Sequence, residues 1–84
     1  MLNEKKRPNK LLLHSVACKL KRLRQDKNLT QETVTHHTGI NIGLIELGKT
    51  NISLITLAAL CSYYNVPLEE FFNEIEYEKE TFLQ

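Results

Sequence analysis

The sequence predicts an all-α domain built from five short helices. Apolar residues recur at intervals of three or four along most of the chain, and these segments are bounded by residues that start or end helices. The composition agrees, because 3 Gly, 2 Pro and no Trp among 84 residues argue against a turn-rich all-β fold. A chain of this length has room for one core, so we expect a single small domain.

The first two helices are predicted from spacing and from their end signals. Residues 10–27 carry apolar side chains at helical intervals, namely Leu12, Leu13, Val16, Leu20 and Leu23. Asn28 ends this helix, because asparagine tolerates the left-handed conformation. Thr30 is a good N-cap for a second helix over roughly 31–38, and Gly39 then breaks that helix.

Three further helices follow. A short third helix starts near Asn41, with Ile42 and Ile45 three residues apart. Ser53 caps a fourth helix, whose core-facing side chains are Leu54, Leu57, Leu60, Cys61 and Tyr64. Pro67 lies near the first turn of a fifth helix that runs from Leu68 to about Ile75. We therefore expect one helical domain over residues 10–75, with residues 76–84 as an acidic tail or a helix extension.

Charge is unevenly distributed along the chain despite a net charge of +1. Residues 1–42 carry nine positive and three negative charges, whereas residues 43–84 carry two and seven. The split suggests one end that faces a polyanion, and the alternative is two solvated surfaces of opposite sign. We expect residues 1–9 to form a flexible basic arm, which is a solvated tail by default or, if the polyanion is DNA, contacts it through Lys5, Lys6, Arg7 and the adjacent Lys10.

Several function classes are disfavoured by what the sequence lacks. No apolar stretch approaches the ~20 residues of a membrane span, and the N-terminal apolar run is too short for a secretory signal. We therefore expect a cytoplasmic protein with no membrane interaction, in which Cys18 and Cys61 are reduced thiols. Metal-ligand spacing, a phosphate-binding glycine loop and a nucleophile–base pair are not apparent, so we expect no cofactor, no metal and no enzyme activity.

Four short motifs stand in the order that a helix-turn-helix requires. They are Leu20-x-x-Leu23-Arg24, Leu29-Thr30-Gln31-Glu32, Thr38-Gly39-Ile40 and Ile45-Glu46-Leu47-Gly48-Lys49. In such a unit a capped second helix directs its N-terminus at phosphate, because free backbone amides there bind anions. A glycine turn then leads into a third helix that is exposed for the major groove of DNA.

With these motifs the chain resembles the Cro/phage-repressor helix-turn-helix family, also called the XRE family, from about Val16 to Phe72. The resemblance implies a lambda-repressor-like fold and a dimeric, DNA-binding transcriptional regulator. It also implies that Arg24 pairs with Glu46 and that Gln31 contacts DNA. The candidate DNA-binding residues are Thr30, Gln31, Asn41, Gly43, Leu44, Lys49, Thr50 and Asn51.

The sequence departs from this family where base-reading residues normally lie. Six residues separate Gly39 from Glu46, about three fewer than is usual. Within this segment Asn41 is the sole polar side chain, and Leu44 can touch only a thymine methyl group. We therefore expect phosphate contacts and DNA shape to supply much of the affinity. Thr35 replaces a small alanine, which suggests that the contact between the second and third helices is rebuilt.

Two functions are consistent with these features. The first is a sequence-specific regulator that binds double-stranded DNA as a homodimer. Because small domains gain stability by association, we expect at least one of Tyr63, Phe71 and Phe72 to face a partner chain. The alternative is a protein-interaction module on a helix-turn-helix scaffold, such as an antitoxin or accessory subunit. The shortened recognition segment and the acidic, aromatic C-terminal end favour this alternative.

Overall fold

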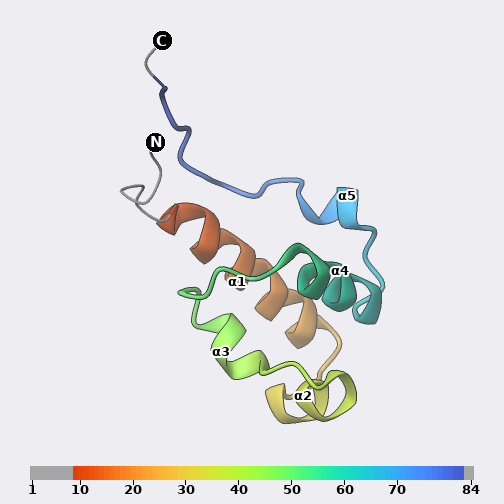
Figure 1. Ribbon diagram of the computed structural model, residues 1–84. Coiled ribbons are helices and arrows are strands. Elements are labelled where there is room, and N and C mark those ends of the chain that lie inside the picture. The colour runs from red at the N-terminus through yellow and green to blue at the C-terminus, as the bar shows by residue number, and fades with distance from the viewer. Residues whose placement is uncertain (1–8, 83–84) are drawn as a thin grey trace.

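A computed structural model describes residues 9–82 and contains, in that range, five helices and no strand (Figure 1). The helices are α1 (Lys10–Asp26), α2 (Gln31–Thr38), α3 (Ile42–Glu46), α4 (Leu54–Tyr63) and α5 (Leu68–Phe71). The predicted all-α fold class is therefore confirmed.

The helix starts are set by side chains that directly precede them. Each of Asn9, Thr30, Asn41 and Ser53 accepts a hydrogen bond from a backbone N–H three residues further on. Such a cap satisfies one of the N–H groups that the first helical turn leaves unpaired, and contributes about 1 kcal/mol. Helix α5 instead follows Pro67, whose restricted φ suits a helix start.

The helix ends mostly agree with the predicted stop signals, except at α5. Asn28 (φ 57°) follows α1, and Gly39 (φ 74°) ends α2 in the left-handed conformation. The prediction that the fifth helix reaches about residue 75 is wrong, because α5 stops at Phe71 and Glu74 has a φ of 69°. A positive φ does not fit a right-handed helix, and residues 76–82 are not helical.

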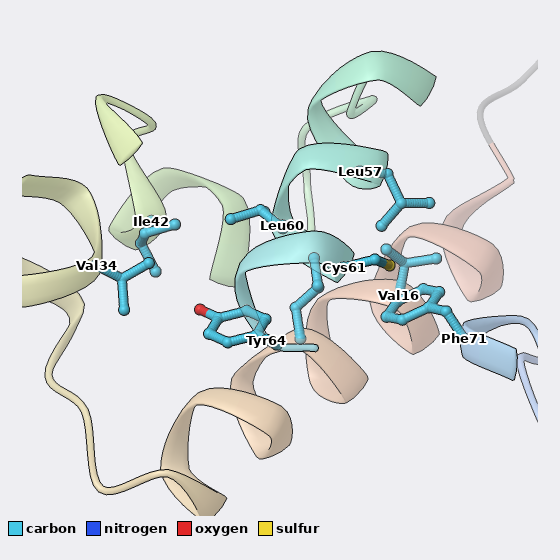
Figure 2. Close-up of a cluster of buried hydrophobic side chains, with 9 residues drawn as sticks. Val16, Val34, Ile42, Leu57, Leu60, Cys61, Tyr64 and Phe71 are labelled. Carbon is cyan, nitrogen blue, oxygen red and sulfur yellow. The ribbon is translucent and has the colours of Figure 1, made fainter. Parts of the chain in front are cut away.

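The core joins all five helices. Its buried side chains come from each of them and include Val16, Leu20, Val34, Ile42, Leu57, Leu60, Cys61, Tyr64 and Phe71 (Figure 2). Through Val34 and Ile42 the short helices α2 and α3 are anchored to the rest of the domain. Phe71 is fully buried, so of the three aromatic residues of which at least one was expected to face a partner chain, Phe71 is not available. It fills the core because α5 packs on α4.

Lys19 on α1 holds the end of α5. Its Nζ donates to the carbonyl oxygens of Glu70, Phe71 and Asn73 at 3.3, 2.7 and 2.9 Å. These carbonyls lie at the C-terminal end of a helix, where a positive charge is favoured. Lys19 therefore helps to hold α5 against α1.

After α5 the chain runs back along α1 in an extended conformation (Figure 1). Ser15 Oγ accepts a hydrogen bond from the backbone N–H of Glu76 at 2.9 Å. Asn9 Nδ2 donates to the carbonyl of Glu78 at 2.7 Å, and Asn9 Oδ1 accepts from the N–H of the same residue at 3.0 Å. The C-terminal segment is thus fixed to α1 by side chains and not by secondary structure.

Candidate nucleic-acid interface

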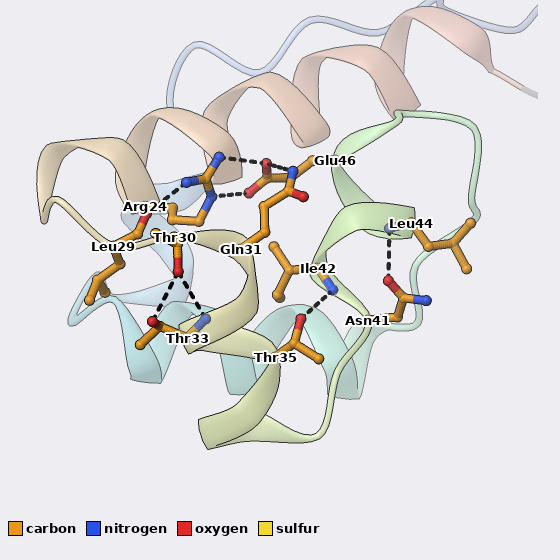
Figure 3. A network of polar contacts seen from close by, with 10 residues as sticks. All are labelled: Arg24, Leu29, Thr30, Gln31, Thr33, Thr35, Asn41, Ile42, Leu44 and Glu46. Atoms are coloured by element: carbon orange, nitrogen blue, oxygen red, sulfur yellow. Dashed lines mark hydrogen bonds and ion pairs between the residues drawn. The ribbon is translucent and has the colours of Figure 1, made fainter.

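A buried ion pair fixes α3 against α1 (Figure 3). Arg24 Nε donates to Glu46 Oε2 at 2.7 Å, and Arg24 Nη2 donates to Glu46 Oε1 at 3.0 Å. The third contact of the guanidinium runs from Nη1 to the carbonyl of Leu29 at 2.7 Å. The hydrogen bond to Glu46 raises the pKa of Arg24, and burial acts in the opposite direction. This contact holds both the end of α3 and the loop before α2.

Gln31 joins the same carboxylate from α2. Its Nε2 donates to Glu46 Oε1 at 2.8 Å, so Arg24 and Gln31 approach Glu46 from two different helices (Figure 3). Gln31 is exposed to solvent, whereas the Glu46 side chain is only 3% exposed. One end of the carboxamide is therefore held by the ion pair while the residue remains on the surface.

The turn between α2 and α3 is closed by threonine hydroxyl groups. Thr38 Oγ1 donates to the carbonyl of Val34 at 2.8 Å and accepts from the N–H of Ile40 at 3.1 Å. Thr35 Oγ1 accepts from the N–H of Ile42 at 3.1 Å, which links the middle of α2 to the first residue of α3. Thr35, which predicted a rebuilt contact between the second and third helices, makes that contact through this hydrogen bond.

Asn41 has a structural role beside its predicted place in the interface. Its Oδ1 accepts from the N–H of Leu44 at 3.0 Å and so caps α3. This contact occupies the oxygen and leaves Nδ2 free of any partner among residues 9–82. Asn41 is exposed, and Leu44 beside it is 48% exposed. The start of α3 therefore projects from the domain despite the short helix.

An open groove lies between α2 and α3. It has a volume of about 430 Å³ and is lined by Gln31, Glu32, Thr35, His36, Asn41 and Gly43. Gln31, Asn41 and Gly43 were predicted from the sequence, but Glu32, Thr35 and His36 were not included among the candidates. Positions 32, 35 and 36 share one helix face by their spacing of three and four, which is the signal that would have identified them.

None of the other predicted residues within 9–82 lines this groove. Lys49 and Asn51 are exposed and Thr50 is half-buried, in the loop between α3 and α4. Thr50 and Asn51 line a separate, mainly apolar pocket of about 190 Å³ against α1 and α4. Thr30 is exposed, but its hydroxyl is engaged by Thr33. Lys10 is exposed at the start of α1, and Lys5, Lys6 and Arg7 lie outside the described residues.

Several large apolar side chains in α4 and directly after α3 and α5 are exposed. Leu47 and Leu54 are each 66% exposed, Ile55 is 84% exposed and Phe72 is 44% exposed. Tyr63 is half-buried, and its hydroxyl lies 2.7 Å from Nδ1 of His37. Of the three aromatic residues considered for a partner contact, Phe72 and Tyr63 are thus accessible.

Residues 9–82 contain no group of three or more His, Cys, Asp or Glu side chains arranged to hold a metal ion. In the same part of the chain, no helix has the length and apolar character that a membrane crossing demands. Cys18 is exposed and Cys61 is buried, and both are free thiols. Burial raises the pKa of the Cys61 thiol, so it behaves as a small apolar core residue.

The fold and the α2–α3 unit define a helix-turn-helix protein: a capped α2, a turn with a left-handed glycine, and an α3 fixed to α1 by an ion pair. A family model described as Helix-turn-helix matches residues 20–71. The chain therefore belongs to the Cro/C1-type (XRE) helix-turn-helix family of DNA-binding regulatory domains, as its motifs indicated. Searches of curated proteins and of solved structures give no match.

Proposed function

We propose that this protein is a sequence-specific regulator that binds double-stranded DNA as a homodimer. Membership of a helix-turn-helix family supports DNA binding. The observation that carries the specific form of the proposal is the polar groove between α2 and α3 beside the projecting start of α3. Hydrogen-bonding side chains at this place match what a major groove presents, since each base pair shows a distinct pattern of donors and acceptors.

The number of free hydrogen-bonding atoms in the groove is small. Asn41 offers Nδ2 because its oxygen caps α3, and Gln31 offers Oε1 and the one Nε2 hydrogen that does not contact Glu46. Glu32 places a negative charge beside the groove, which disfavours close approach of phosphate. Readout therefore rests on few side chains, and backbone contacts and DNA shape contribute the remainder of the affinity.

Selection of bound duplexes from a random pool tests this function. We expect a pair of related half-sites about one helical turn apart, since a two-fold dimer presents its two recognition units at that spacing. Fluorescence anisotropy with the selected duplex should show affinity that falls as salt rises, because phosphate contacts release counterions. Binding without any preferred sequence would contradict the proposal.

The homodimer is supported by the exposed apolar side chains. Leu54, Ile55 and Phe72 are 66%, 84% and 44% exposed, and exposed apolar side chains that lie together mark contacts with other chains. Sedimentation at increasing concentration should show a dimer, and Ile55→Glu together with Phe72→Glu should shift it to monomer. A chain that stays monomeric at all concentrations, also on DNA, would contradict this part of the proposal.

A protein-interaction module is the second candidate function. The same exposed apolar surface and the short α3 of five residues favour it. On this view a partner protein covers Leu54 and Ile55, and the α2–α3 groove has no DNA ligand. Failure of the duplex selection, combined with a stoichiometric complex that the Ile55→Glu substitution abolishes, would favour this function over DNA binding.

A further inference from the structure

The orientation of the Gln31 carboxamide is determined by the group it contacts. Glu46 Oε1 lies 2.8 Å from Gln31 Nε2, and a carboxylate only accepts hydrogen bonds. The NH₂ group of Gln31 must therefore face Glu46, and the carbonyl oxygen Oε1 must face away from it. The negative charge of Glu46 thus selects one of the two possible orientations of the Gln31 carboxamide.

Glu46 is itself a fixed anchor. Two hydrogen bonds from Arg24, at 2.7 and 3.0 Å, hold its two oxygens, and its side chain is 3% exposed. A hydrogen bond to an immobile, buried carboxylate restricts Gln31 more than a bond to a mobile surface group. The ion pair therefore does more than join two helices, because it also sets the position of an exposed side chain.

Gly43 leaves the space into which the Gln31 oxygen projects. A Cβ atom at Gly43 would lie 3.3 Å from Gln31 Oε1 and 3.6 Å from Asn41 Oδ1. Glycine is not needed here for the backbone, because the positive-φ glycines are Gly39 and Gly48 and position 43 is inside α3. Alanine would favour the helix more than glycine does at position 43. The glycine thus keeps the space beside Gln31 Oε1 open.

We infer that Gly43 and Glu46 are positioning residues for Gln31, which they hold as a pre-oriented reader of adenine. This inference rests on the proposed function and specifies how the same groove recognises its DNA. Gln31 presents the acceptor Oε1 and the second hydrogen of Nε2, and glutamine pairs with the N6 and N7 atoms of adenine through these two groups. Pre-orientation lowers the entropy lost when the contact forms.

A double-mutant cycle on the full chain tests the inference. We would measure the affinity of wild type, Gln31→Ala, Gly43→Ala and the double variant for the duplex that wild type selects. Each single substitution should weaken binding about tenfold, and the double variant should bind like Gln31→Ala alone, because Gly43 acts through Gln31. Both single variants should lose preference for adenine at the same position of the selected duplex.

Controls separate this effect from general damage to the fold. The melting temperature of Gly43→Ala should stay within about 4 °C of wild type, since better helix propensity offsets the shifted carboxamide. Gln25→Ala removes an exposed glutamine from the end of α1, outside the groove, and should bind DNA like wild type.

Three results would overturn the inference. The first is an equal loss of affinity on Gly43→Ala with and without Gln31, the second is an unchanged base preference in Gln31→Ala, and the third is unfolding of Gly43→Ala. Each of these leaves the proposed function intact, provided that wild type still selects a sequence. Failure of wild type to select any duplex would instead refute the proposed function, and the inference with it.

Discussion

Helix α1 makes two contacts of opposite character. Towards the helix-turn-helix, Arg24 meets the buried carboxylate of Glu46 in a side-chain ion pair. Towards the C-terminal segment, Lys19 and Ser15 of α1 and its N-cap Asn9 make hydrogen bonds to backbone groups, and Lys19 Nζ also lies 5.3 Å from the centre of the Phe71 ring. The first contact depends on the identity of a partner side chain, whereas the hydrogen bonds of the second need only a backbone carbonyl or N–H at the right place. Substitutions should therefore be far more costly at the first contact.

Arg24→Ala is the strongest test of this difference. It leaves the Glu46 carboxylate buried without its cation, which should lower the free energy of unfolding by about 3–5 kcal/mol. Urea denaturation followed by circular dichroism measures this loss. Arg22→Ala, which removes an exposed charge from the same helix, is the control and should change stability by less than about 0.5 kcal/mol. A variant of Arg24 that melts like wild type would show that the ion pair is dispensable.

Because Arg24→Ala can unfold a domain of this size, Arg24→Met combined with Glu46→Met provides a second measurement. Removing both charges avoids an unpaired buried carboxylate, so the double variant should be more stable than Arg24→Ala. A double variant as unstable as the single one would mean that the loss comes from packing.

Lys19→Met should have an intermediate effect at the second contact. The substitution keeps the apolar stem and removes three hydrogen bonds to carbonyl groups, so we expect a loss of about 1–3 kcal/mol. Hydrogen exchange should be faster in α5 and the following segment, while α2 and α3 remain protected. Lys21→Met serves as the exposed control. Equal loss of protection in α2 would contradict the separation of the two contacts.

Asn41→Ala should cost about 1 kcal/mol, because the N-cap of α3 is lost. It should also weaken DNA binding, because Nδ2 is removed from the groove. Asn41→Ser separates these roles, since serine caps a helix but has no amide. The serine variant should keep the melting temperature of wild type and still bind DNA less tightly. Restored affinity in Asn41→Ser would show that only the cap matters.

The smallest effect at neutral pH is expected at Tyr64, which is buried and interacts with the charges of Glu46 and Arg24. Burial, followed by the charge of Glu46, raises the pKa of Tyr64 to about 12. An unfolded tyrosine ionises near pH 10, so the folded state binds the proton more tightly and stability should fall as the pH rises from about 10 to about 12. Denaturation series of wild type and Tyr64→Phe should diverge only in this range. Parallel curves would contradict the raised pKa.

Local features of the fold were predictable from the sequence. Thr30, Asn41 and Ser53 were each identified at a helix start, and all three accept a hydrogen bond from the third residue that follows. A cap needs only a short polar side chain and a helix after it, so its geometry is complete within four residues. The same holds for Gly39, whose left-handed conformation ends α2.

The candidate interface was predictable only in part. The motif order placed Gln31, Asn41 and Gly43 near each other, and all three line the groove. The resemblance, and not the spacing, implied the contact of Arg24 with Glu46. Lys49, Thr50 and Asn51 follow α3 in sequence, but the loop carries them away from the groove, because Thr50 and Asn51 face a pocket against α1 and α4.

The sequence by itself determined where the helices begin, through their caps and the spacing of apolar residues, because these depend on neighbours within one or two turns. It did not determine that α5 ends at Phe71 or that Leu54, expected in the core, is exposed. Tertiary structure decided which partner is contacted by a side chain that could interact with several. Lys19 binds carbonyls more than fifty residues away, Gln31 binds Glu46, and Phe71 is buried. A charge, an amide and an aromatic ring are each compatible with solvent or with a partner, and only the packed helices bring the partner within reach.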